Sequence, residues 1–160
     1  MLNIMLSKKG YLKLRSEFDE LSLKERPKVV QGVANAAAEG DRSENAEYIY
    51  GKKRLREIDK RLQYLSKILK NPKIVSKSMV DTSVVSFGCI VEVMDENGAK
   101  KVWTIVGEGE ADYKQGTISA RAPVARALLG KKIGDVVEVE LQKGITEFEI
   151  LSINSGDIDP

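Results

Sequence analysis

The chain has 160 residues, of which 42% are hydrophobic and 31% charged, so it can bury the core of one domain or of two small ones. It contains no histidine and one cysteine, Cys89, which excludes an internal disulfide, imidazole metal ligands and Ser-His or Cys-His catalysis. Carboxylates remain as the expected metal ligands or bases. A lone cysteine fits a reducing cytoplasm, and because no apolar run reaches membrane length we expect no membrane partner.

The net charge of +2 hides a strong asymmetry between the two halves. Residues 1–79 hold 18 Lys and Arg against 10 Asp and Glu, a net +8, whereas residues 80–160 hold 8 against 14, a net −6. A basic half predicts a polyanionic partner such as nucleic acid. The acidic half argues against a protein that simply coats DNA.

Helical periodicity organises the first half. Apolar residues recur three and four positions apart over residues 11–21, and Ser7 before them can act as an N-cap. Pro27 interrupts this stripe, and because proline removes a backbone donor we expect a kink there. A cleaner stripe covers residues 55–69 and ends before Pro72. The pattern therefore predicts two long helices.

Folding the chain back at residues 41–43 predicts an antiparallel hairpin of these helices. The apolar stripes then meet along its base, and small residues should form the seam near the turn, where the helices can approach closely. These small residues are Ala36, Gly32 and Gly51.

The turn itself carries a cluster of acidic residues. Gly40 can take the left-handed conformation that ends a helix, and Asp41 with Glu44 has the spacing of a capping pair. A capping pair needs no other function and contributes about 1 kcal/mol to a helix start. Directly behind the turn lies a dense basic run, residues 52–61.

The second half changes to the period of β-strands. Residues 76–83 are expected to form a linker, and the segments after it predict an α+β domain whose mostly antiparallel sheet carries one packed helix. The predicted strands are residues 89–94, 101–106, 116–120, 136–141 and 145–153, with a helix at 123–129, an Asn97-Gly98 turn and a frayed tail at 155–160.

The turn and the basic run together resemble the bacterial transcript cleavage (Gre) factors, and within them the GreB type. The resemblance rests on Gly40-Asp41-Arg42-Ser43-Glu44-Asn45-Ala46-Glu47-Tyr48 and on residues 52–61, and it extends to residues 10–11, 25–27, 73–75, 123–129 and 134–135. It covers essentially the whole chain. The GreA type usually has Leu and Lys where this chain has Arg42 and Ser43.

The resemblance implies an N-terminal antiparallel α-helical coiled-coil hairpin (1–75) with an acidic tip at 41–44, a linker (76–83), a C-terminal FKBP-like α+β domain (84–154) and a tail (155–160). Such a protein binds bacterial RNA polymerase through the FKBP-like domain and inserts its coiled coil into the secondary channel. There it stimulates Mg²⁺-dependent cleavage of the 3′ end of backtracked nascent RNA. It is not an enzyme by itself, and we expect a monomer.

The resemblance also implies roles for individual residues. Asp41 and Glu44 are the catalytic pair and would share Mg²⁺ with the polymerase active site. Glu47 is interpreted first as a solvated helix charge and second as an accessory metal ligand. Support for the tip is expected from Arg42, Ser43, Asn45 and Tyr48. Contacts to RNA phosphates are expected from Lys52, Lys53, Arg54, Arg56, Lys60 and Arg61. Docking to the polymerase is expected around Pro123 and Arg126.

Other interpretations of the same residues remain open at this point. The cations could be solvated flanks of a coiled coil, with Glu57 and Asp59 as partners within the helix. Residues 123–129 could simply cover the sheet. We expect Trp103, Phe148 and Cys89 to belong to the core.

Two competing functions follow from the same resemblance. One is a Gre-like inhibitor that blocks the secondary channel, against which the intact acidic pair argues. The other is an FKBP-like peptidyl-prolyl isomerase, whose pocket would need aromatic rings. The second half offers only Phe87, Trp103, Tyr113 and Phe148.

Overall fold

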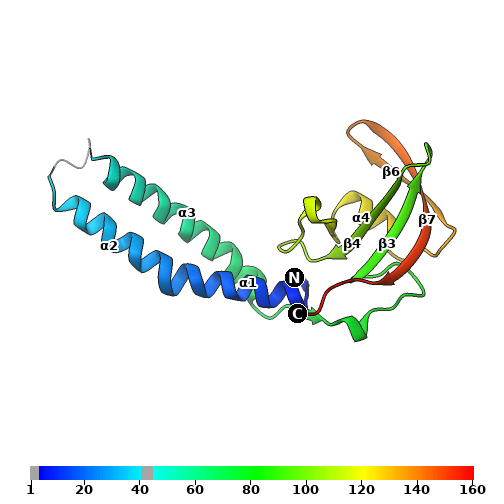
Figure 1. Cartoon of the computed structure of the whole chain (residues 1–160), viewed down its shortest axis with the longest axis horizontal. Helices are drawn as coiled ribbons and strands as arrows, with labels where there is room; N and C mark the ends of the chain where they lie inside the picture. The colour runs from blue at the N-terminus through cyan, green and yellow to red at the C-terminus, as the bar shows by residue number, and fades with distance from the viewer. Residues whose placement is uncertain (1–3, 41–44) are drawn as a thin grey trace. The chain divides into compact units, whose positions relative to one another are not determined.

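The structure, a computed structural model, describes residues 4–40 and 45–160, and the chain divides into two compact units. One unit is Lys13–Asn71, and the other combines residues 4–12 with Pro72–Pro160. The first is helical and the second contains the main sheet (Figure 1). This composition confirms the predicted α+β class. Among the described residues, no helix is both long enough and apolar enough to cross a membrane.

The helical unit forms an antiparallel hairpin in which α2 lies beside α3 (Figure 1). Its elements are α1 (Lys8–Glu20), a π-helical turn (Leu21–Glu25), α2 (Arg26–Ala37) and α3 (Ala46–Leu69). At 1.5 Å per residue, the 24-residue α3 is about 36 Å long.

The irregularity predicted at Pro27 takes the form of the π-helical turn. Pro27 lies in the first turn of α2 and has no N–H, and the Arg26 N–H just before it donates to the Leu21 carbonyl, five residues back. The helical path therefore continues past the proline with a shifted hydrogen-bond register.

The seam of the hairpin is narrow near the turn. Gly51 is buried against Val33, and a Cβ added at Gly51 would lie 2.6 Å from Val33 Cγ2. Ala36 is 1% exposed, as predicted. Gly32 is exposed with nothing within 4 Å of its Cβ position, so its predicted place in the seam is wrong. The helical period turns Val33 inward instead. The buried residues of the seam are Leu14, Leu21, Ala36, Gly51, Ile58 and Leu65.

The second unit is built on a five-stranded sheet of order β5-β4-β3-β7-β6. Its strands are β3 (Cys89–Asp95), β4 (Lys100–Val106), β5 (Thr117–Ser119), β6 (Val136–Leu141) and β7 (Gly144–Ser155). All pairs are antiparallel except β4 with β5. These strands confirm the predicted segments, with ends shifted by up to two residues. The turn at Gly98 has the expected positive φ of 84°.

The core of this unit lies between the sheet and α4 (Pro123–Leu128). Trp103 and Phe148 make an edge-to-face contact with ring centroids 5.5 Å apart, and Ala125 and Leu128 of α4 are fully buried in the same cluster. Cys89 is also fully buried. The core interpretation of these residues is confirmed.

The N-terminal residues differ from the predicted 1–75 domain because they join the second unit. Strand β1 (Met5–Ser7) pairs in parallel with β2 (Lys73–Val75). The Glu110 carboxylate accepts hydrogen bonds from the backbone N–H groups of Ser7 (2.7 Å) and Gly107 (3.1 Å) and from the Ser7 hydroxyl. Burial raises the pKa of Glu110, and these hydrogen bonds oppose the shift. The start of α1 is thus anchored in the second unit.

The predicted linker (76–83) and tail (155–160) are also ordered parts of the second unit. The linker contains a 3₁₀ turn at Lys77–Met79, and Val80 packs against the core. Ile158 is fully buried with Val75, and its carbonyl accepts from the Lys9 N–H at 2.8 Å. The prediction of a frayed tail is wrong because the Ile158 side chain is buried in the second unit and holds the tail there.

We expect Gly51→Ala to destabilise the hairpin relative to Gly32→Ala. The added methyl at Gly51 meets the stiff Val33 side chain, which costs about 1–3 kcal/mol, partly offset by the gain in helix propensity of about 1 kcal/mol. The same methyl at exposed Gly32 meets nothing and should only stabilise. Thermal unfolding followed by helical circular dichroism measures both, and equal stability of the two variants would contradict the close approach.

Candidate functional site

The predicted acidic pair, Asp41 and Glu44, and the neighbouring Arg42 and Ser43 lie outside the described residues. The described chain resumes at Asn45, directly before α3. On the other side of the turn, the C-cap of α2 is Ala38, and Gly40, two residues later, has a positive φ of 128°.

Asn45 connects the ends of the two helices. Its Oδ1 accepts from the Tyr48 N–H at 3.1 Å, which makes it the N-cap of α3, and its Nδ2 donates to the Ala36 carbonyl at 2.9 Å in the last turn of α2. The described N-cap of α3 is therefore Asn45, and the capping role predicted for Asp41 and Glu44 lies outside the described residues. The two hydrogen bonds of Asn45 join the ends of α2 and α3, and its predicted support of the tip stays a prediction.

The acidic residues that remain near the described turn do not make a metal site. Glu47 is exposed in the first turn of α3, where a carboxylate interacts favourably with the helix dipole. Across residues 4–40 and 45–160, no group of three or more Cys, Asp or Glu could hold a metal ion. The Mg²⁺ ligands therefore remain a prediction that rests on residues 41 and 44.

Arg54 and Arg61 of the basic run bond to the other arm of the hairpin. Arg54 Nε donates to Glu25 Oε1 at 2.8 Å and its Nη1 to Glu57 at 3.2 Å. Arg61 makes a two-point contact to Glu17, with distances of 2.6 and 2.8 Å. The hydrogen bond from Arg61 holds the pKa of Glu17 below its usual value. Both arginines are half-buried, so their first role is to join the helices.

The other four cations of the run are exposed and have no ion pair among the described residues. They are Lys52, Lys53, Arg56 and Lys60. At 100° per residue, Lys53 and Lys60 lie on the side of α3 opposite the buried Gly51, Ile58 and Leu65. Together these four cations form the outer basic face.

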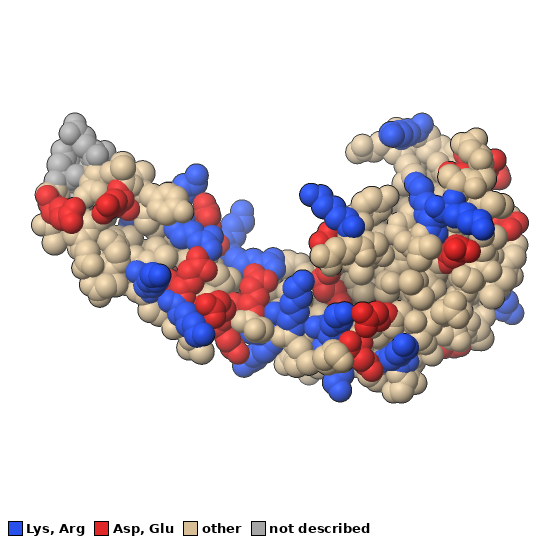
Figure 2. Space-filling view, in the orientation of Figure 1, with Lys and Arg blue, Asp and Glu red and all other residues tan. Residues whose placement is uncertain are grey.

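The nearest described carboxylates of α3 bond to arginines outside this outer basic face. Glu57 accepts from Arg54, and Asp59 accepts from Arg26 of α2 at 2.7 and 3.3 Å. The interpretation of Asp59 as a partner within the same helix is therefore wrong. Figure 2 shows acidic and basic side chains interspersed over the visible surface of the hairpin. No motif in the sequence indicates Glu17 and Glu25 as partners, although the antiparallel register places them opposite Arg61 and Arg54.

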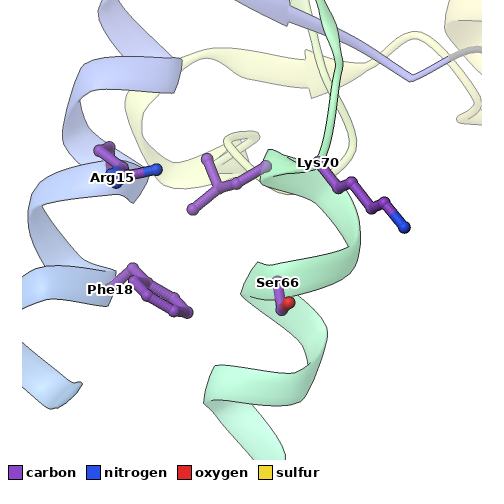
Figure 3. Close-up of a pocket in the computed structure, with 5 residues that line it drawn as sticks. Arg15, Phe18, Ser66 and Lys70 are labelled. Atoms are coloured by element: carbon purple, nitrogen blue, oxygen red, sulfur yellow. The ribbon is translucent and has the colours of Figure 1, made fainter.

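A cavity of about 180 Å³ lies between α1 and the end of α3 (Figure 3). It is lined by Arg15, Phe18, Ser66, Leu69 and Lys70. It contains no carboxylate and none of the predicted site residues, so it is not the predicted metal site.

Comparison with known families covers both halves of the chain. A model described as transcription elongation factor, N-terminal, matches residues 4–74, and one described as transcription elongation factor, GreA/GreB, C-term, matches residues 80–155. The chain belongs to the GreA/GreB family. The resemblance found in the sequence is confirmed.

Individual Gre relatives match over nearly their whole length. The transcription elongation factor GreB of Haemophilus influenzae is 48% identical over 148 residues, which is 92% of this chain and 94% of the relative. The transcription elongation factor GreA of Alkalilimnicola ehrlichii is 39% identical over 155 residues, 96% of this chain and 98% of the relative. Among solved structures, GreA factor homolog 1 (Gfh1) of Thermus thermophilus is 23% identical, covers 96% of this chain and 100% of that chain, and has a TM-score of 0.46.

In this Gre-family chain α4 carries both its structural and its predicted docking residues. Ala125 and Leu128 are buried, while Pro123 and Arg126 are exposed on the same short helix. Just before α4, Arg121 donates to Glu108 at 3.2 Å. The helix therefore covers the sheet and still leaves Pro123 and Arg126 accessible to a partner, so their docking role stays a prediction.

We expect Glu17→Gln to weaken the hairpin near neutral pH but not in acid. The pKa of Glu17 is lowered in the folded state, so its contribution is present above the unfolded value and is lost as the pH falls through the folded value. Because the pair is partly exposed, the loss should not exceed about 1 kcal/mol. Thermal unfolding against pH measures it.

The matched control for this measurement is Glu20→Gln, which removes the looser pair to Lys24 at 3.4 Å on the same arm. Near neutral pH, Glu20→Gln should lower the free energy of unfolding less than Glu17→Gln does. A difference between the two variants that persists at acidic pH would contradict the role of the Glu17–Arg61 pair.

Proposed function

We propose that the chain binds RNA polymerase, inserts its helical hairpin into the secondary channel and stimulates cleavage of the 3′ segment of backtracked nascent RNA. In this proposal the second unit docks through the surface around Pro123 and Arg126, and the turn of the hairpin delivers Asp41 and Glu44. The hydrolysis belongs to the polymerase, and the chain acts as a monomer in the cytoplasm, where bacterial polymerase works. Membership of the GreA/GreB family over both halves supports this assignment.

The observation that carries the proposal is the outer basic face of α3. Four cations without ion pairs to described residues follow the turn along one helix, and the four carboxylates of Glu17, Glu25, Glu57 and Asp59 bond to arginines instead. Lysine and arginine arranged in this way attract phosphates and position a nucleic acid without reading its sequence. Arg54 and Arg61 contribute indirectly, since they hold α3 against the opposite arm.

Asp41 and Glu44 have the chemistry that Mg²⁺ prefers, because carboxylate oxygens are its usual protein ligands. Two carboxylates do not make a complete site, so we propose that the polymerase supplies the remaining ligands. A bound Mg²⁺ supplies charge that activates water and stabilises the leaving oxygen. The chain contributes by holding its ligands in place, and Asn45 serves this purpose by fixing the helix ends on either side of the turn.

Two competing functions have less support. An inhibitor of the secondary channel would not need the Asp41 and Glu44 pair, which this chain retains. A peptidyl-prolyl isomerase would need an aromatic pocket, but Trp103 and Phe148 are buried against each other and Tyr113 is 68% exposed. An assay that records both RNA cleavage and inhibition of elongation distinguishes the proposed function from a channel inhibitor. A peptide isomerisation assay tests the second alternative.

We expect Asp41→Ala and Glu44→Ala each to abolish stimulated cleavage in a backtracked complex across a Mg²⁺ titration. Each variant removes one of two oxygen donors, whereas the proposed docking surface is on the other unit. Binding to polymerase should therefore be nearly unchanged. Glu39→Ala, which removes an exposed carboxylate outside the pair, is the control. Loss of polymerase binding in the Asp41 or Glu44 variants would contradict this division of roles.

We expect the double charge reversal Lys52→Glu and Lys53→Glu to reduce crosslinking to the RNA 3′ segment. Each lost phosphate contact should lower the slope of log affinity against log salt by about one unit. The control reverses Lys13 and Lys28, two exposed cations of the other arm. Unchanged crosslinking in the Lys52 and Lys53 variant would show that the outer basic face is an ordinary solvated surface.

A further inference from the structure

Two large side chains are exposed at the start of α3, on the second turn. Tyr50 is 71% exposed and Ile49 is 52% exposed. Tyr50 has no hydrogen bond or ring contact to any described residue. Exposed apolar residues are common when they occur singly, so the exposure alone has no functional meaning.

The position of Tyr50 gives its exposure a meaning, because it lies beside the outer basic face. On a helix, residues three and four apart are neighbours, so both Tyr50 and Ile49 lie next to Lys53. Arg56 lies two turns after Ile49 on the same side of α3. The aromatic ring and the unpaired cations are therefore presented to solvent together.

Another tyrosine of α3, Tyr64, shows what a structural aromatic looks like in the same helix. Tyr64 is half-buried, and the Arg61 guanidinium, itself bonded to Glu17, lies 5.4 Å from its ring centroid. Tyr64 thus contacts another side chain of the hairpin, and Tyr50 has no such contact to a described residue. The described part of the hairpin therefore gives the Tyr50 ring no packing role.

We propose that Tyr50 is a stacking platform for an unpaired base of single-stranded RNA whose phosphates lie along Lys52, Lys53, Arg56 and Lys60. Cations that follow a backbone and an aromatic ring that stacks a base are the two elements of sequence-tolerant single-strand binding. Four cations without described partners favour a polyanion over a protein surface at this position. A duplex keeps its bases stacked, so only a single strand could use the ring. This inference rests on the proposed function and names a residue within its RNA-binding surface.

The stacking role separates Tyr50 from the phosphate-contacting cations in a measurable way. Tyr50→Ala should weaken the affinity of the full chain for a single-stranded RNA oligonucleotide by roughly tenfold at low salt. The slope of log affinity against log salt should stay unchanged, because no phosphate contact is lost. Tyr50→Phe keeps the ring and should bind like the wild type. Tyr113→Ala removes a tyrosine of similar exposure from the other unit and should also have no effect.

A second measurement reports stacking directly. The native Trp103 is only 5% exposed, whereas position 50 is exposed to solvent. The tryptophan introduced by Tyr50→Trp is therefore the one that RNA can reach. Its fluorescence should be quenched by the RNA oligonucleotide, with the wild-type chain as background. The inference is overturned if Tyr50→Ala binds RNA as tightly as the wild type, if its salt slope falls, or if Tyr50→Trp is not quenched.

The outcomes also distinguish this inference from the proposed function. If Tyr50→Ala weakens binding to a polymerase complex that has no backtracked RNA, the ring contacts protein and the inference is wrong. If the wild type shows Tyr50-dependent RNA binding but stimulates no cleavage, the proposed function fails and the stacking role remains. If the wild type does not bind the oligonucleotide at low salt, the outer basic face and the stacking role are both wrong.

Discussion

Two helices packed against each other have one buried side each, and this constraint sorts the residues of α3 by their position around its axis. Gly51 and Ile58 face the other arm and form the seam. Arg54 and Arg61 lie at the border of the seam, where they reach carboxylates of the opposite arm. Among the described residues, the cations on the far side reach no carboxylate. The same basic run therefore both joins the hairpin and leaves a charged surface exposed.

The positive charge of the outer basic face depends on which side chains the acidic residues of the hairpin pair with. Glu17, Glu25 and Asp59 all bond to arginines across the two arms. Each such pair is worth little by itself at a partly exposed position, but it removes one carboxylate that could have screened a lysine. Asn45 also makes two contacts with one side chain. Its amide oxygen accepts from the Tyr48 N–H and caps α3, and its amide nitrogen donates to the Ala36 carbonyl in the last turn of α2.

Residues near the N-terminus are held in the second unit by contacts with three later segments of the chain. β1 pairs with β2, the Glu110 carboxylate accepts from Ser7 at the end of β1, and Ile158 is buried beside Val75, the last residue of β2. A Cβ at Gly10 would lie 2.2 Å from Glu110 Oε1, so this close approach explains why a glycine stands in the first turn of a helix. Residues 4–12 are thus held in the second unit by residues that are distant in the sequence.

The sequence by itself determined the helices, the strands of the main sheet, the buried Trp103 and the family, because periodicity, turn residues and motifs are local signals. Only the tertiary structure decided the pairing of β1 with β2, the burial of Ile158 and the separation of Arg54 and Arg61 from the four exposed cations. These features depend on which distant residue lies opposite, and no local pattern contains that information. A lysine or arginine looks the same in sequence whether or not a carboxylate on another helix reaches it.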